Sequence, residues 1–350
     1  MINTETSGPP AESFVFLLSP AFSMIAFSAA VEPLRIANRV ARRPLYAWRT
    51  VSAGGEPVRC SNGVAVAVDG GLAEVRRDET ILVCGGERLE AAASSPVLNW
   101  LRRARRQGVR LGAVCTGTYV LARAGVIGDL PCTIHWENMA AFSEEFPDVD
   151  LRNLLFVVRN TMMTCAGGNA ATDMMLNLIV ARHGQDIAST VADTMLHMAA
   201  RGDADEQRLS VPARIGVRHP KLIEIIHRME QSTEEPISPA ELARDVGMST
   251  RQLERLFRRY LNRSPKRYYM EMRLEKARGL LMQTNLSVIN VALACGFTSP
   301  SHFSKCYRAH FGRTPYRERG APHSGVPKMT SVISPEAPIA PDPDGEALLG

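Results

Sequence analysis

The sequence predicts an α/β domain built on a parallel sheet, followed by an all-α domain with two helix-turn-helix motifs. Three observations carry this prediction. Apolar runs alternate with helical patterns through the first 200 residues. A helix-turn-helix pattern then occurs twice between residues 237 and 312. Finally, residues 218–320 hold 19 Lys and Arg against 10 Asp and Glu, a net charge of +9, although the whole chain is only +5.

The first 200 residues predict strands and helices in alternation. Short apolar runs predict strands at residues 14–18, 48–51, 64–68, 80–84 and 109–114, and a late hairpin at 155–158 and 162–165. Helical spacing predicts helices at residues 24–40, 96–107, 117–124 and 170–182. Such alternation favours a parallel sheet that is covered by helices on both faces.

Cys115 follows the strand predicted at residues 109–114, and ligands bind at the carboxyl ends of strands in such sheets. Small residues between Gly112 and Gly117 favour a sharp strand-to-helix turn of the nucleophile-elbow type. The helix that starts after Thr116 would direct backbone N–H groups at a bound carboxylate. The alternative interpretation is that Cys115 is only a small buried apolar residue.

His135 lies 20 residues after Cys115 and could meet it at the strand ends as a thiolate–imidazole pair. The neighbouring Trp136 offers a ring face that attracts cations, above all quaternary ammonium groups. Glu32 and Glu137 are candidate counter-charges. Each of these side chains could equally be an ordinary polar residue without a ligand.

The two helix-turn-helix patterns keep the same register. Ser238 and Ser287 can cap first helices, Gly247 and Gly296 can end them, and a Ser or Thr two residues after each Gly can start the second helix. That rule places the second caps at Ser249 and Thr298. Leu253 and Phe303 repeat after 50 positions, as do Pro265 and Pro315. A helical bundle that binds no nucleic acid is the alternative, but the local positive charge argues for a polyanion partner.

The second helix of each unit is expected to enter the major groove of double-stranded DNA. The residues predicted to face DNA are Thr250, Arg251, Gln252 and Arg255 in the first unit, and Ser299, Ser301, His302 and Lys305 in the second. A helix of about 19 residues, roughly 28 Å at ~1.5 Å per residue, is predicted between the units. Its length suits two recognition helices in successive grooves, which repeat every ~34 Å.

The predicted organisation is an α/β domain at residues 12–200, a linker at 201–217, a DNA-binding domain at 218–320 with motifs near 238–260 and 287–311, and a disordered Pro-rich tail at 321–350. No apolar run suits a membrane span, and no secretory leader is visible. The seven Cys form no CxxC pair, which favours reduced thiols in the cytoplasm. We expect neither a metal nor a cofactor.

The carboxy-terminal residues resemble the AraC/XylS transcriptional regulators, through Leu253–Phe257, Arg273–Arg278, Val291–Phe297 and His302–Tyr307. The first 200 residues resemble the class I glutamine amidotransferase-like (ThiJ/PfpI) superfamily, through Val83–Gly86, Gly112–Cys115 and Gly167–Gly168. This resemblance implies a flavodoxin-like sheet. The order of the two parts resembles the GlxA-type subgroup. Within that subgroup, Ala30–Asn38, Thr133–Glu137 and Asp173–Leu176 are most similar to regulators of quaternary-amine catabolism, which respond to glycine betaine, dimethylglycine or carnitine. Arginine- and sarcosine-responsive relatives share much of this pattern, so an amino-acid-derived effector stays open.

Enzymes of this superfamily carry a Glu near the position of Ala26, or a late His-x-Glu, and this chain has neither. Residues two after His183, His197 and His219 are Gln, Ala and Lys. The resemblance therefore implies a catalytically inactive effector pocket in a homodimeric activator of promoter DNA, with RNA polymerase as a further partner. Two alternatives stay open. One is a DNA-tethered cysteine hydrolase or amidase that uses Cys115 and His135, and the other is an architectural DNA-binding protein whose first domain only dimerises.

Overall fold

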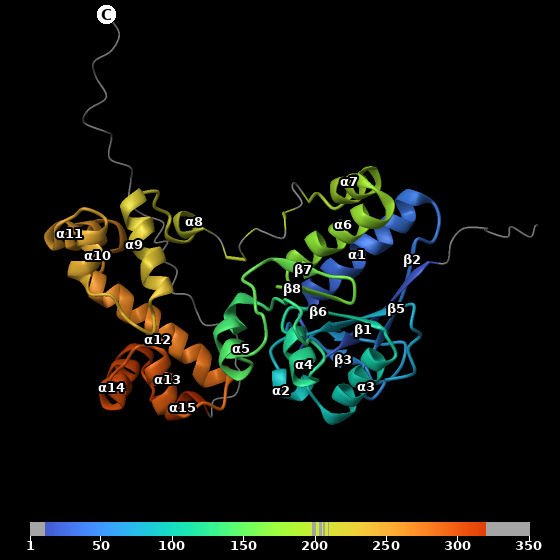
Figure 1. The fold of residues 1–350 in the computed structure, drawn as a ribbon, viewed down its shortest axis with the longest axis horizontal. Helices are drawn as coiled ribbons and strands as arrows, with labels where there is room; N and C mark the ends of the chain where they lie inside the picture. Colours follow the sequence, from blue (N-terminus) through green and yellow to red (C-terminus); the bar gives the residue numbers. More distant parts are fainter. Residues whose placement is uncertain (1–10, 198–200, 203–204, 206, 209, 320–350) are drawn as a thin grey trace, which may run out of the picture.

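The computed structural model describes residues 11–197, 201–202, 205, 207–208 and 210–319; the predicted tail at 321–350 lies outside them. An α/β domain and a helical domain lie side by side, and the segment after α7 (Gln185–Thr194) connects them (Figure 1). The α/β part and the helical part follow one another in the order that the sequence predicts.

The central sheet of the α/β domain has six strands in the order β2-β1-β5-β6-β8-β7. Every neighbouring pair is parallel apart from the antiparallel hairpin of β7 and β8, which confirms the predicted sheet and late hairpin. The strands span Glu12–Leu18 (β1), Tyr46–Val51 (β2), Glu79–Cys84 (β5), Arg110–Val114 (β6), Phe156–Val158 (β7) and Met162–Cys165 (β8).

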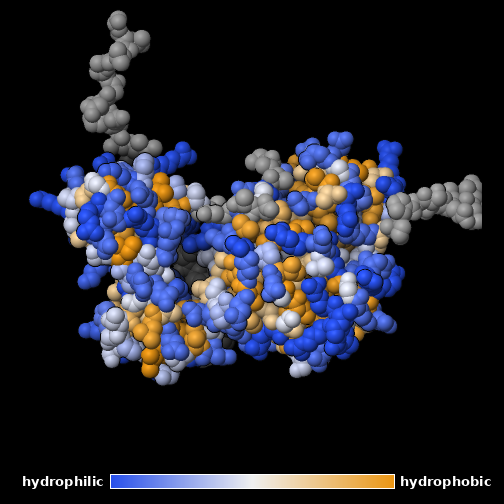
Figure 2. All heavy atoms as spheres, in the orientation of Figure 1, coloured by the Kyte–Doolittle hydropathy of each residue, from blue (hydrophilic) through white to orange (hydrophobic). Residues whose placement is uncertain are grey.

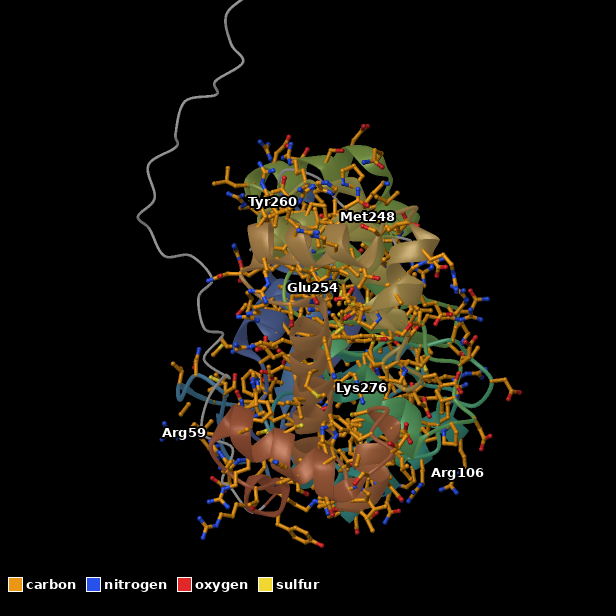
Figure 3. The ribbon with its side chains drawn as sticks, turned by 90° about the vertical axis from the view of Figure 1, so that its left-hand side faces the viewer. Arg59, Arg106, Met248, Glu254, Tyr260 and Lys276 are labelled. Carbon is orange, nitrogen blue, oxygen red and sulfur yellow. The ribbon has the colours of Figure 1, made fainter. Side chains whose placement is uncertain are left out.

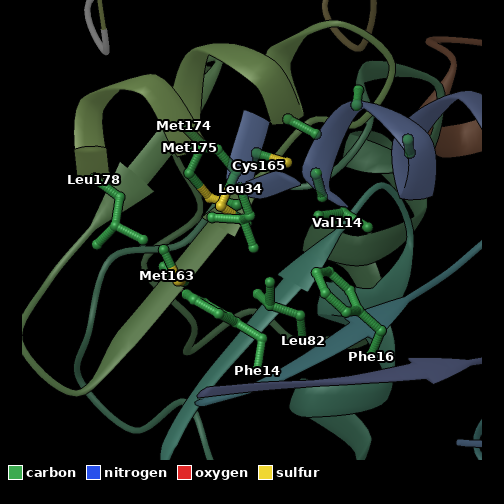
Figure 4. Close-up of a cluster of buried hydrophobic side chains, with 14 of the residues drawn as sticks. Phe14, Phe16, Leu34, Leu82, Val114, Met163, Cys165, Met174, Met175 and Leu178 are labelled. Carbon is green, nitrogen blue, oxygen red and sulfur yellow. The ribbon is translucent and has the colours of Figure 1, made fainter. Parts of the chain in front are cut away.

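Helices cover both faces of the sheet because alternate side chains of its strands point to opposite sides. Phe14 and Phe16 of β1 pack with Leu34 of α1 (Met24–Ala41) and Met174 of α6 (Ala170–His183), as Figure 4 shows. The residues between them face the second layer, which is formed by α2 (Leu89–Ala92), α3 (Ser95–Arg106) and α4 (Gly117–Arg123). Each face therefore has its own apolar core.

Some elements of the α/β domain differ from the sequence prediction. The strand predicted at residues 64–68 is reduced to β4 (Ala65–Val66), which pairs with β3 (Val58–Arg59) outside the central sheet. The short helices α2 and α7 were not predicted, nor were the 3₁₀ turn η1 (Trp136–Asn138) and α5 (Met139–Glu145) that follows it. Segments this short carry too few apolar residues to show a helical period.

The helical domain consists of two small units at the ends of a long helix, α12 (Figure 3). Its helices span Val211–Ile215 (α8), Pro220–Gln231 (α9), Pro239–Asp245 (α10), Thr250–Leu261 (α11), Pro265–Gln283 (α12), Val288–Ala294 (α13), Pro300–Phe311 (α14) and Pro315–Arg319 (α15). The 19 residues of α12 confirm the predicted connecting helix. One apolar core joins α9 to α11, and a second joins α12 to α13 and α14.

Serine side chains cap five of these helices, each accepting a hydrogen bond from the N–H three residues on: Ser238, Ser249, Ser264, Ser287 and Ser299. The predicted cap at Thr298 is wrong, since the second recognition helix begins one residue later, after Ser299. Pro300 explains the shift: its missing N–H suits the first helical position, so the cap must be the residue before it.

Among the described residues, the domains meet in two regions. Helix α5 packs against α12, and Ala141 of α5 is buried in the same apolar core as Leu274 and Ala277 of α12. The segment predicted as a linker makes the other contact, since Gln207 and Arg208 both touch the α/β domain. Within this segment, α8 contributes Val211 to the core of α9–α11.

Candidate functional site

Cys115 occupies a sharp turn between β6 and α4, as the small residues around it suggest. Its φ is +59°, in the left-handed region that L-residues rarely adopt. Its N–H donates to Cys165 O at 3.1 Å, and Thr116 Oγ1 donates to Gly86 O at 2.6 Å. A Cβ on Gly85 would lie 2.1 Å from Gly117 N. The turn therefore depends on glycine where the two strand ends approach.

The surroundings of Cys115 do not activate its thiol. Burial raises the pKa of Cys115 to about 11, so the side chain is a neutral thiol near pH 7. Among the described residues, the groups that shift the pKa of this thiol besides burial are Thr116, which hydrogen-bonds it, and the carboxylate of Glu137. Gly167 covers it so closely that a Cβ there would lie 2.7 Å from Cys115 Cβ. His135 is not among the groups that shift this pKa, so the described residues show no sign of the thiolate–imidazole pair considered from the sequence.

A cavity of about 370 Å³ lies above this turn, on the side of the α/β domain that meets the linker segment. Its size falls in the range of ~300–1,000 Å³ that is usual for small-molecule sites. The polar and aromatic residues of its wall are His135, Trp136, Asn169, His197, Arg201 and Gln207. Of the six predicted ligand residues, His135 and Trp136 line it, and Cys115, Thr116, Glu32 and Glu137 do not.

A buried carboxylate holds two side chains of the cavity wall, Arg201 and His197, in place. The Asp173 side chain is fully buried and accepts a hydrogen bond from Arg201 Nη2 at 2.8 Å. Its other oxygen lies 2.7 Å from His197 Nε2. Arg201 Nε adds a second bond to the carboxylate at 3.1 Å. Arg201 is therefore oriented at the wall, with further guanidinium N–H groups left for a ligand. The sequence prediction missed Arg201 and His197, although it did single out the Asp173 motif.

His135 and Trp136 come together at the start of η1, with ring centroids 5.6 Å apart. Burial lowers the pKa of His135, and the Glu137 carboxylate, 3.8 Å from Nδ1, partly opposes the shift. His135 is therefore neutral near pH 7. The Trp136 ring is 38% exposed. Glu32 is on helix α1 and does not line the cavity; its carboxylate pairs with Arg35 at 2.6 Å.

The recognition helices present the predicted faces. In α11, Thr250, Arg251, Gln252 and Arg255 are exposed, whereas Leu253 and Phe257 are buried. In α14, Ser301, His302 and Lys305 are exposed, whereas Phe303 and Tyr307 are buried. Both helices are carried on the outer side of the helical domain, away from the α/β domain (Figures 1 and 3). Figure 2 shows hydrophilic side chains around this part of the molecule.

Two of the predicted DNA-facing residues also have a structural task. Gln252 Oε1 accepts a hydrogen bond from Ser249 N at 2.8 Å, which completes a capping box at the start of α11. Ser299 Oγ accepts from His302 N and so caps α14. A base contact through Gln252 would therefore compete with its cap, whereas Arg251 and Arg255 are committed to no such bond among the described residues.

Fold and site together define a class of protein: an α/β domain with a cavity of ligand size, joined to two basic helix-turn-helix units. In the described part of the chain, no helix has the length and apolarity needed to cross a membrane. Comparison with known proteins agrees with this class. Residues 16–181 match the DJ-1/PfpI family, and residues 242–321 match a helix-turn-helix domain family.

Whole-length relatives extend the match. The chain is 42% identical to HTH-type transcriptional regulator GbdR of Pseudomonas aeruginosa over 338 residues, covering 97% of this chain and 92% of GbdR. It is 42% identical to regulator CdhR of the same organism, covering 93% and 96%, and 40% identical to regulator GlxA of Rhizobium meliloti, covering 86% and 93%. The chain belongs to the GlxA-type AraC/XylS family of DNA-binding transcriptional regulators.

Proposed function

We propose that this regulator activates transcription as a homodimer when a small zwitterion with a methylated ammonium group binds its α/β domain: quaternary in glycine betaine and carnitine, and tertiary in dimethylglycine. The bound dimer would recognise double-stranded promoter DNA and assist RNA polymerase. The observation that carries the effector class is the wall of the 370 Å³ cavity, which offers both the ring of Trp136 and the guanidinium of Arg201.

The two ends of such a zwitterion match different parts of this wall. A quaternary ammonium group cannot donate hydrogen bonds, so an aromatic face is its natural partner. A carboxylate pairs best with an oriented guanidinium, and Asp173 fixes the orientation of Arg201 through two hydrogen bonds. The Glu137 carboxylate lies close to His135, so it places a negative charge near the part of the wall where the ligand's ammonium group would bind.

A thermal-shift screen of glycine betaine, dimethylglycine, carnitine, sarcosine and arginine tests this proposal. A ligand at 100 times its Kd stabilises the folded protein by ~2.7 kcal/mol, which raises Tm by roughly 5–10 °C. Trp136→Leu should abolish the shift for quaternary amines. Tyr316→Leu is the matched control, since that ring is exposed on α15. If every compound leaves Tm unchanged, the effector class is wrong.

We further propose that α11 and α14 read the operator. Arg251 and Arg255 supply the side chains suited to guanine edges, whereas Ser301 and Lys305 suit phosphates. His302, Thr250, Gln252 and Ser299 complete the two contact faces. Footprinting of promoter fragments with and without glycine betaine tests the assignment. Equal binding to promoter and random duplexes at physiological salt contradicts sequence-specific recognition.

The hydrolase alternative is not favoured, because burial raises the pKa of Cys115 and no imidazole of the described residues is among the groups that act on its thiol. We therefore propose that the α/β domain binds without catalysis. Incubation with candidate amides and esters tests this, and turnover that disappears in Cys115→Ala would revive the enzyme hypothesis.

A further inference from the structure

The cation site at Trp136 is already filled by a side chain of the protein itself. The Arg208 guanidinium lies over the Trp136 ring, 4.5 Å from its centroid. This is the position in which a cationic ligand group would stack. Burial is the main cause that lowers the pKa of Arg208, and the carboxylates of Glu230 and Glu137 oppose that shift. The guanidinium nevertheless stays charged at any physiological pH.

Arg208 also reaches the other domain. Its Nη1 lies 3.4 Å from Glu230 Oε1, on helix α9 of the helical domain. The same side chain therefore contacts Trp136, a residue of the cavity wall, on one side and the DNA-binding part of the molecule on the other. Arg214 pairs with the same Glu230 carboxylate, at 2.6 and 3.0 Å, so Glu230 remains compensated when Arg208 leaves. Removal of Arg208 from this contact would thus leave no unpaired buried charge.

The residue before Arg208 anchors the segment in place. Gln207 Nε2 donates to Thr133 Oγ1 and Ile134 O at 2.9 Å and to Leu154 O at 3.0 Å. The contacts of Arg208 with other described residues are made by its side chain, which is 41% accessible. Gln207 can therefore keep the backbone docked while the Arg208 side chain turns out to solvent. Such a rotation exchanges one cation for another without opening the domain.

We propose that Arg208 is a built-in occupant of the effector's cation site, and that a quaternary ammonium group displaces it from Trp136 and so breaks its tie to Glu230. This proposal rests on the effector class given above and adds how binding is signalled. A neutral ligand, or one with only a carboxylate, could fill the cavity without releasing Arg208. The cationic group thus distinguishes an activating ligand from one that merely binds.

The first test compares the affinities of Arg208 variants for glycine betaine and for tetramethylammonium by calorimetry. Arg208→Gln removes the competitor, so both probes should bind about 3- to 10-fold more tightly than to the wild type. Arg208→Lys keeps a cation and should resemble the wild type. Arg76→Gln is the matched control, because Arg76 is an exposed arginine paired only with Asp78 among the described residues. Unchanged or weaker binding by Arg208→Gln overturns the proposal.

The second test uses trypsin, which cleaves after Arg and Lys, and follows by mass spectrometry the peptides that result from cleavage after Arg208. Displacement turns the Arg208 side chain out to solvent, where the protease can bind it, so glycine betaine should speed cleavage at this bond. A ligand that clamps the segment over the cavity would slow it. Faster cleavage supports the proposal, and slower or unchanged cleavage overturns it. The binding data distinguish failure of the effector class from failure of the displacement of Arg208. If neither probe binds any variant, the effector class fails as well; if wild-type binding is normal but Arg208→Gln gains nothing, only the displacement of Arg208 fails.

Discussion

Gly247 and Gly296 hold the same place in the two helix-turn-helix units, but alanine should be tolerated far better at the first than at the second. Both have left-handed backbones, with φ of +63° and +72°. A Cβ on Gly247 would meet nothing within 4 Å. A Cβ on Gly296 would lie 2.7 Å from the carbonyl oxygens of Thr233 and Glu234 and 2.6 Å from Pro236 Cγ.

The magnitude follows from these surroundings. A left-handed alanine costs ~1–2 kcal/mol, and the smaller entropy of its unfolded chain returns ~0.4–1 kcal/mol. Gly247→Ala should therefore destabilise the protein by about 1 kcal/mol. Gly296→Ala adds the displacement of two backbone carbonyls, for which overpacked sites suggest ~1–3 kcal/mol. We expect a total near 3 kcal/mol for Gly296→Ala.

Guanidinium titrations can assign the loss to one domain. The three tryptophans, Trp48, Trp100 and Trp136, all lie in the α/β domain. Because Trp136 also contacts Arg208, the titrations use a Trp136→Phe background, in which fluorescence follows the α/β domain through Trp48 and Trp100. Far-UV circular dichroism also follows the helical domain. Gly296→Ala should move the dichroism transition to lower denaturant and leave the fluorescence transition nearly unchanged. If Gly247→Ala costs as much as Gly296→Ala, the Thr233–Pro236 contact has no energetic weight and the reasoning is refuted.

Three further predictions concern the sites. Iodoacetamide should alkylate Cys115 at pH 7.5 about 100-fold more slowly than an ordinary exposed thiol, because burial raises the pKa of Cys115 to about 11. The rate should rise with pH up to about that value. Rapid alkylation of Cys115 at pH 7.5, detected by mass spectrometry, contradicts this. Arg251→Ala should cost ~1–3 kcal/mol at one base position in competitive gel shifts, whereas a uniform loss, like that expected for Arg258→Ala, would make Arg251 a phosphate contact. Because burial lowers the pKa of His135, the unfolded chain binds its proton more readily. The stability that His135 contributes is thus complete above ~6.5 and is lost as pH falls, and His135→Gln should flatten the unfolding profile below that pH.

Local patterns were sufficient for most of the fold. The apolar strands that end at Cys84 and Val114, the capping serines and the 19 residues of α12 are each encoded within one short segment. The cavity wall is not. Arg201 and Gln207 fall in a polar stretch that is typical of a linker, and only the folded chain brings them to Asp173 and Ile134. Contacts between residues that are distant in sequence leave no periodic signal.

The same limit applies to α5. Nothing in the sequence around Ala140 and Ala141 indicates that they belong to an apolar core. Their burial depends on α12, which is distant in sequence and packs against α5. The prediction of Thr298 as the cap of α14 was wrong for the opposite reason. The deciding signal, Pro300, was local, but the prediction followed the register of the repeat instead.

Trp136 lies where two connections to the helical domain begin. In the first connection, the Arg208 guanidinium stacks on the Trp136 ring and pairs with Glu230 of the helical domain. In the second, η1 begins at Trp136 and is followed by α5, which packs against α12. An effector at this ring can bias both contacts at once, but only by the difference between its affinities for the two states of the protein. A coupling of ~1–3 kcal/mol is typical of such regulation. In the displacement proposed above, the stacking that Arg208 gives up is worth ~0.5–2 kcal/mol, a cost of the same size that the effector's own contacts must exceed.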